Sequence, residues 1–241
     1  MFIGFYNSIS VGMAFLLFIS MILCTGISSA EVKKGEYLRE DYIDIIEKTH
    51  SPSIAFSELS GEPTLIRAYQ GEYDLVLIHN FHEFYDGLDI MEDGKFHRTA
   101  FEGGDPSNIT VTVDGDNLIM TDYDTEGPLH YVYVGDAQRY AAKKVIVGDY
   151  VDSEGKTYSF KEDGTALFGD VQFQYEIGLD FVLRPKSSKD NNKRDCFQNS
   201  KSRELFEYEI KGGVMSIYRT SGQESMDVEP EPFLKIKKTS K

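Results

Sequence analysis

Short apolar runs of period two, most of them ended by a turn sequence, fill the chain from Leu65 onwards. Ile109, Val111 and Val113, for example, alternate with threonines before the turn at 114–117. Successive side chains of a β-strand point to opposite faces, so this period is typical of strands with one buried face. Turns that contain Asp-Gly favour tight hairpins. The sequence therefore predicts a mainly β protein built from antiparallel strands.

Two segments depart from this period and predict helices. Glu36–Thr49 has apolar residues at helical spacing with acidic residues on the other face, and a Ser-Pro-Ser sequence ends it. Asp136–Lys144 combines a suitable N-cap residue with alanines and two terminal lysines. We expect the first helix before the strands and the second, a short one, between two β segments.

These elements divide the chain into five parts. We expect a signal peptide over 1–30, an N-terminal helix and connector over 31–64, a first antiparallel β domain over 65–135, a linker helix over 136–144 and a second antiparallel β domain over 145–241. A chain of 241 residues is long enough for one large core or two small ones. One larger sandwich is the alternative, because it would show the same alternation.

The two β segments contain similar turns in the same order. Gly71-Glu72-Tyr73 corresponds to Gly148-Asp149-Tyr150, Glu92-Asp93-Gly94 to Glu162-Asp163-Gly164, Val111–Gly115 to Tyr208–Gly212, and Pro128-Leu129 to Pro232-Phe233. Tandem duplication explains this order, and so does the ordinary pattern of an antiparallel meander. The order resembles that of the small lipocalin-like β-barrel domains of bacterial envelope proteins. The chain has no Trp, so Tyr73 or Tyr150 stands at the Trp of the lipocalin Gly-x-Trp opening. The resemblance implies two tandem barrels or curled sheets.

The first thirty residues predict export. They carry no charged side chain, and residues 11–24 form an apolar run. Small residues at Ser28 and Ala30 favour cleavage before Glu31. Lipid modification at Cys24 and an uncleaved anchor are the alternatives. We expect a periplasmic or extracellular protein that meets the membrane only if this N-terminus is kept or lipidated.

Charge is distributed unevenly along the chain. Residues 31–135 hold 22 acidic and 7 basic side chains, whereas residues 136–241 hold 18 of each. The net charge of −15 repels phosphate backbones, so we expect no nucleic-acid partner. The segment Arg184–Arg203 is basic, with seven basic and two acidic residues. It is either a solvated loop or a docking loop for an anionic partner, such as the acidic first half of another copy.

Two segments have residue types suited to metal binding. His79-Asn80-Phe81-His82-Glu83 offers two imidazoles and a carboxylate, as a hydrolytic zinc site requires. Its spacing differs from the helical zinc-protease motif, and positions 79 and 82 of a strand face opposite sides. Asp122, Asp124, Glu126 and Gly127 match a calcium loop, but Tyr133 stands where the bidentate Glu is needed. We therefore expect no metal, no cofactor and no catalytic residue.

Two further groups of residues are candidates for a functional role, the lone cysteine after residue 30 and the alternating aromatic residues. Cys196 is expected in a polar loop as an exposed thiol, and an intermolecular disulfide is the alternative. Aromatic residues alternate along three expected strands, at Tyr131 and Tyr133, Phe173 and Tyr175, and Phe206 and Tyr208. Such pairs either pack in a core or line a barrel interior that holds an apolar ligand.

The combined observations predict an exported, non-catalytic binding or interaction protein of the cell envelope or extracellular space. Its partner would be a protein or a small apolar ligand. The first alternative is a carrier that holds a small apolar ligand in an aromatic barrel interior. The second alternative is a metal-dependent hydrolase that uses the cluster of His79, His82 and Glu83.

Overall fold

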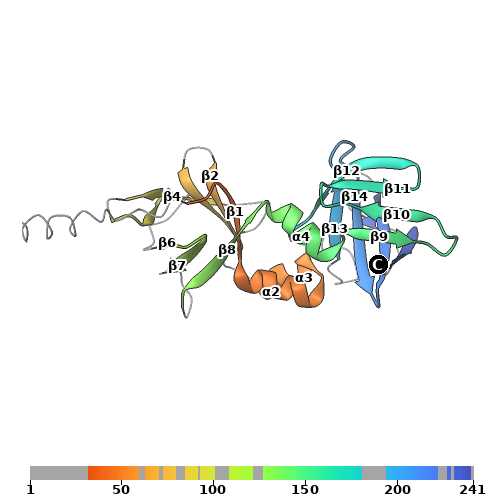
Figure 1. Cartoon of the computed structure of the whole chain (residues 1–241), viewed down its shortest axis with the longest axis horizontal. Helices are drawn as coiled ribbons and strands as arrows, with labels where there is room; N and C mark the ends of the chain where they lie inside the picture. Colours follow the sequence, from red (N-terminus) through yellow and green to blue (C-terminus); the bar gives the residue numbers. More distant parts are fainter. Residues whose placement is uncertain are drawn as a thin grey trace, which may run out of the picture. The chain divides into compact units, whose positions relative to one another are not determined.

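Two closed antiparallel β-barrels follow each other along the chain (Figure 1). The structure is a computed structural model that describes residues 32–59, 63–70, 73–79, 85–91, 93–100, 109–121, 127–180, 194–221, 227–228 and 231–239. Each barrel is a ring of eight strands in which consecutive strands of the ring pair antiparallel. The predicted mainly β class and the tandem arrangement are confirmed, while the predicted signal peptide lies outside the described residues.

The first barrel is an eight-stranded meander that closes between its first and last strands. Its strands are β1 (Gly35–Arg39), β2 (Leu65–Gln70), β3 (Tyr73–Ile78), β4 (Tyr85–Ile90), β5 (Phe96–Ala100), β6 (Thr110–Asp114), β7 (Asn117–Thr121) and β8 (Leu129–Gly135). The interior is mostly aliphatic, with Leu75, Leu77 and Met120 fully buried. This is the core that alternating Val, Leu and Ile residues produce when every second side chain faces inward.

The second barrel has the same strand order. Its ring contains β9 (Gly148–Val151), β10 (Thr157–Phe160), β11 (Thr165–Phe168), β12 (Val171–Ile177), β13 (Asp195–Asn199), β14 (Leu205–Lys211), β15 (Val214–Ser221) and β17 (Leu234–Lys238). Pairing of β17 with β9 closes the ring. The short strand β16 (Asp227–Val228) pairs with the end of β15.

Among the described residues, three helices accompany the barrels. Helices α2 (Glu40–Thr49) and α3 (Pro52–Glu58) lie between β1 and β2 in the chain, and α4 (Ala137–Val145) joins the two barrels. The N-caps of α3 and α4 are Ser51 and Asp136, whose side chains accept hydrogen bonds from the backbone three residues later. Helix α4 lies within one residue of the helix predicted at 136–144.

Strand β1 corrects the prediction of a helix over 36–49. Residues Gly35–Arg39 pair with both β2 and β8, and helix α2 starts only after them. Tyr37 and Leu38 are both buried, because one faces the barrel interior and the other packs against the helices. A strand buried on both faces has no period that distinguishes it from the adjoining helix. The first barrel therefore begins at Gly35 and not at Leu65.

One hydrophobic core connects both barrels through the helices. It contains Leu38, Leu65 and Ile78, which lie outside the interior cluster of the first barrel. It continues through buried residues of α2 and α4, such as Ile46 and Ala141, into the interior of the second barrel. Residues 32–241 accordingly form one compact unit.

The first strands of the two barrels share a detailed local structure. Gly35-Glu36-Tyr37 opens β1, and Gly148-Asp149-Tyr150 opens β9. Both tyrosines are buried, and each hydroxyl donates to the carbonyl four residues earlier, over 2.9 Å in Tyr37 and 2.7 Å in Tyr150. Both glycines have positive φ, +138° and +153°, a backbone conformation that favours glycine. The two barrels therefore begin with the same motif.

Two of the four predicted turn correspondences hold in the structure. The hairpins β6–β7 and β14–β15 join the sixth and seventh strands of their rings, and β8 and β17 are the eighth strands. The other two are wrong in place. Tyr73 begins a third strand whereas Tyr150 lies in a first strand, and the turn at Gly94 follows a fourth strand whereas that at Gly164 follows a second. Similar turn sequences recur within a meander, so spacing alone did not identify equivalent strands.

We expect Ile46→Ala to destabilise both barrels together. Ile46 is fully buried in the core that joins them, and removal of such a side chain costs about 2–5 kcal/mol. Native-state hydrogen exchange should show a parallel loss of protection in β3 and in β13. Asp44→Ala, at an exposed position of the same helix, is the control and should leave protection unchanged. Loss confined to one barrel would contradict a shared core.

Candidate functional site

The two predicted metal-binding segments lie mostly outside the described residues. His79 is half-buried directly after β3, but His82 and Glu83 are not described. The calcium-like segment 122–126 is not described either. In the part of the chain that the structure describes, no group of three or more His, Cys, Asp or Glu side chains is placed to hold a metal ion. The expectation that neither segment binds metal therefore rests on the sequence alone.

The predicted basic loop Arg184–Arg203 is not a single loop. Residues 184–193 lie outside the described residues, but Asp195–Asn199 forms β13 in the wall of the second barrel. This strand pairs with β12 and β14, and Phe197 is fully buried. The sequence Asp-Cys-Phe-Gln-Asn has too few apolar residues to show a period, so only the neighbouring strands make it a strand.

Cys196 is buried, which corrects the prediction of an exposed thiol. It lies on β13 and is 7% exposed. Burial raises the pKa of its thiol to about 12, and the negative charges of Asp180, Asp195 and Glu207 add to this effect. The thiolate is the form that attacks disulfides and alkylating reagents. The predicted intermolecular disulfide would therefore require β13 to open.

We expect Cys196 to react slowly in the folded protein. A pKa of about 12 in place of 9.0 lowers the thiolate fraction at neutral pH roughly thousandfold. Labelling with an aromatic disulfide reagent at pH 7.5 should be slow under native conditions and rapid in denaturant. Rapid native labelling of Cys196, or a dimer linked through Cys196 in the exported protein, would contradict this burial.

A buried polar cluster attaches the helices to the second barrel. The Asp195 carboxylate accepts hydrogen bonds from the Ser51 hydroxyl over 3.0 Å and from the Ser53 backbone N–H over 2.8 Å. The Tyr42 hydroxyl donates to the Leu179 carbonyl, just after β12. Burial raises the pKa of Asp195 despite these donors. The contacts involve both the side chains and the backbone of α3, so we assign them a structural role at what we call the helix end of the second barrel.

We expect Asp195→Ala to lower the free energy of unfolding by about 2–3 kcal/mol, because two buried donors lose their acceptor. Asp170→Ala, in an exposed turn of the same barrel, is the control for chemical denaturation.

Asp195→Asn keeps a hydrogen-bond acceptor but cannot ionise. Since the pKa of Asp195 is raised, ionisation of the buried carboxyl costs stability. Asp195→Asn should therefore gain stability relative to the wild type as pH rises above 3.8; a pH-independent difference would contradict this.

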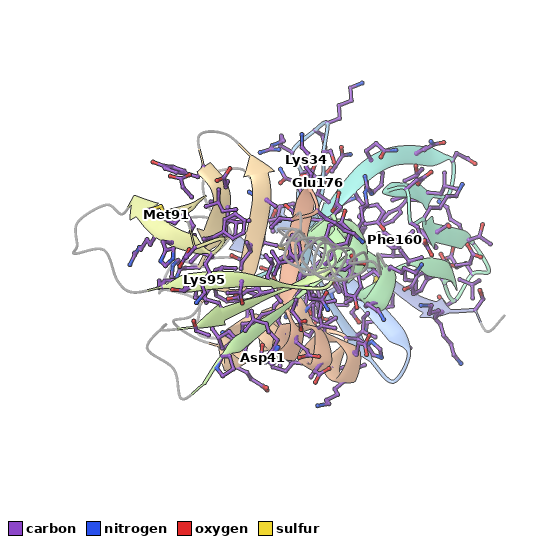
Figure 2. All side chains as sticks on the ribbon, turned by 60° about the vertical axis from the view of Figure 1, so that its left-hand side comes forward. Lys34, Asp41, Met91, Lys95, Phe160 and Glu176 are labelled. Carbon is purple, nitrogen blue, oxygen red and sulfur yellow. The ribbon has the colours of Figure 1, made fainter. Side chains whose placement is uncertain are left out.

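Aromatic rings pack against one another inside the second barrel. Phe160 is central, with ring centroids 5.3 Å from both Tyr175 and Phe197 and 6.0 Å from Tyr150. Most of these pairs meet edge to face, the arrangement that aromatic rings favour in cores. Figure 2 shows Phe160 among the strands of this barrel. The alternating aromatics noted in the sequence therefore fill the barrel here.

The end of the second barrel away from the helices has a partly exposed aromatic rim. Strand β12 runs from Val171 at this far end to Ile177, just before the Leu179 carbonyl at the helix end. Val171 pairs with Phe168, and Phe206 pairs with Arg219, so each pair shares one face of the barrel wall. The far-end rim consists of Phe168, Val171, Phe173, Phe206, Arg219 and Phe233. Val171 is 62% exposed and Phe233 is 36% exposed.

Arg219 gives this apolar rim a positive charge. Its guanidinium carbon lies 4.5 Å from the centroid of the Phe233 ring, which is itself 6.0 Å from Phe206. Arg219 is exposed, and no carboxylate among the described residues forms an ion pair with it. The rim can therefore contact an apolar group and place a cation beside it.

Sequence reasoning did not identify this rim. Phe173, Phe206 and Phe233 were noted separately, and nothing in the sequence singled out Arg219. The rim depends on which strands adjoin across the ring, and on Phe233 lying next to Phe206 although 27 positions separate them. The only local signal was the recurrence of aromatic residues at strand ends.

Comparison with known proteins adds no relative. No family model matches the chain, and no significant match occurs among curated proteins or solved structures. Among the described residues, no helix has the length and apolar character needed to cross a membrane.

Proposed function

We propose that the chain is an exported, non-catalytic binding protein that holds an apolar group of a partner at the far-end rim of the second barrel. The observation that carries this proposal is the exposed Phe233 ring with Arg219 stacked on it, together with the exposure of Val171 at the same end of the barrel. Exposed apolar side chains that lie together are typical of binding surfaces. Aromatic and arginine residues also dominate the energetics of protein interfaces.

The packed interior of the second barrel favours binding at the rim over binding of a ligand deep inside the barrel. A carrier needs space among its aromatic side chains, but Phe160 contacts Tyr175 and Phe197 at the distances of a filled core. In the first barrel, Leu77 and Tyr131 are likewise fully buried within an aliphatic cluster. These contacts support recognition at the surface more than carriage of a small apolar ligand.

The lipocalin-like resemblance forms part of this proposal. Two eight-stranded antiparallel barrels are compatible with it. The sequence pattern put Tyr73 or Tyr150 at the lipocalin Trp, and the buried tyrosines of the two opening Gly-acid-Tyr motifs, Tyr37 and Tyr150, support the resemblance. Export is supported by the uncharged first thirty residues. No observation on the described residues favours the hydrolase that would use His79, His82 and Glu83.

Site-specific photo-crosslinking tests the proposal. A photoreactive p-benzoylphenylalanine placed at Val171 should form a discrete adduct with the bound partner in the exported fraction of the native cells. The matched control places the same group at Gln172, which is the next residue of β12 and is also exposed. Because successive residues of a strand face opposite sides, Gln172 should give no such adduct.

Two results would overturn the proposal that the far-end rim is the binding site. One is the absence of any adduct at Val171, and the other is the same set of adducts at both positions. Circular dichroism of both labelled proteins should match that of the wild type, so that a negative result is not caused by misfolding.

A further inference from the structure

Apart from the far-end rim, exposed large apolar side chains gather at one other place in the described structure. The exposed large apolar residues are Ile54, Ile90, Met91, Val171 and Phe233, and the last two belong to the rim. Ile90 and Met91 are adjacent, 49% and 47% exposed, where β4 turns into β5. Figure 2 labels Met91 and Lys95 on this hairpin of the first barrel. We call the described residues 89–91 and 93–95 the hairpin tip.

Backbone hydrogen bonds hold the hairpin tip in a defined shape. The N–H of Met91 donates to the Lys95 carbonyl over 2.9 Å, and the N–H of Gly94 donates to the Met91 carbonyl over 2.9 Å. Gly94 has φ of +76°, as this tight turn requires. Ile90 and Met91 are thus presented on a structured hairpin, so a partner can bind them without first ordering a loop.

Acidic side chains flank these two apolar residues. Asp89 precedes Ile90, and Asp93 follows Met91 within the turn. The pKa of Asp93 is lowered, chiefly by a hydrogen bond from His97 over 3.0 Å, so its carboxylate stays negative. Residues 31–135, which include the tip, hold 22 acidic against 7 basic side chains. The tip therefore combines apolar side chains with negative charge.

The far-end rim has the complementary properties. Its aromatic rings suit an aliphatic or thioether side chain, and methionine makes favourable contacts with aromatic edges. Arg219 supplies the positive charge beside them, and the exposed Lys201 and Arg203 lie in the turn between β13 and β14 at the same end of the barrel. The charges of tip and rim thus have opposite sign, as in interfaces whose encounter is steered by electrostatics.

We propose that the hairpin tip of one copy binds the far-end rim of a second copy, with Met91 against the exposed ring of Phe233 and an acidic side chain of the tip beside Arg219. This proposal rests on the proposed function, because it names the partner that the rim holds. The two surfaces belong to different barrels, so the contact is heterologous and links copies head to tail.

One hairpin on one barrel end buries less than the roughly 1,000 Å² expected of a stable interface. We therefore expect weak, concentration-dependent association that decreases with salt, because exposed charges contribute to it. Sedimentation velocity of the full exported protein over a range of concentrations, at low and at high salt, measures this association.

Two variants test the contact itself. Met91→Lys alters the tip and leaves the rim intact, whereas Phe233→Ala alters the rim and leaves the tip intact. Each variant alone should associate at least tenfold more weakly than the wild type. A mixture of the two should form a one-to-one complex that grows no further, because only one intact tip and one intact rim can meet. Ile54→Ala, at a third exposed apolar position, is the control and should associate like the wild type.

The outcomes separate the two proposals. Wild-type association that both variants weaken and their mixture restores to a dimer supports the head-to-tail contact. A monomeric wild type, or variants that associate as the wild type does, overturns it. If the wild type is monomeric while photo-crosslinking at Val171 captures a different molecule, the proposal of a second copy as partner is wrong, but the proposal that the rim binds a partner is supported. If neither occurs, both proposals are wrong. Matching thermal midpoints show that the variants are folded.

Discussion

Burial of one face of α2 is the constraint on which the rest of the structure depends. Tyr42, Ile43 and Ile46 form that face, and they belong to the same core as the outer residues Leu38 and Leu65 of the first barrel. Without the helix, these outer side chains would meet water at a cost of about 25 cal/mol per Å² of apolar surface. The same face also contacts the second barrel, since the Tyr42 hydroxyl donates to Leu179. Helix α2, together with α4, thus joins the two barrels through one shared core.

This arrangement restricts where a partner can bind. Each barrel closes on itself, so its wall offers few unpaired strand edges for another strand to join. The helix end of the second barrel is occupied by Tyr42, Ser51 and Ser53. Packed rings around Phe160 leave side chains at the far end as the natural contact surface. Because these packed rings hold the rim side chains in place, the rim would lose little conformational freedom when a partner binds.

The architecture could be predicted from the sequence because it depends on local patterns. Alternation, Asp-Gly turns and the alanine-rich segment at 137–145 each follow from the preferences of nearby residues. The sequence-based prediction was wrong where tertiary contacts determine the secondary structure. The sequence of β1 resembled a helix because both faces of this strand are buried. The sequence of β13 resembled a loop because it is mostly polar, although Asp195 forms buried hydrogen bonds and Phe197 packs in the aromatic core. The rim at Arg219 and Phe233 could not be predicted, because ring closure brings it together.

The two barrels share a strand framework but differ in their interiors and their charge. Both open on the same Gly-acid-Tyr motif with the same tyrosine hydrogen bond, so the strand framework is shared. The first barrel is mostly aliphatic inside and lies in the acidic part of the chain. The second barrel is rich in aromatic residues inside, and its part of the chain is neutral. Framework contacts explain the shared motif, but they do not require an exposed Met91 on one barrel or an exposed Arg219 stacked on Phe233 on the other. Because stability does not require these features, they support the proposed recognition, in which the first barrel presents a surface and the second receives it.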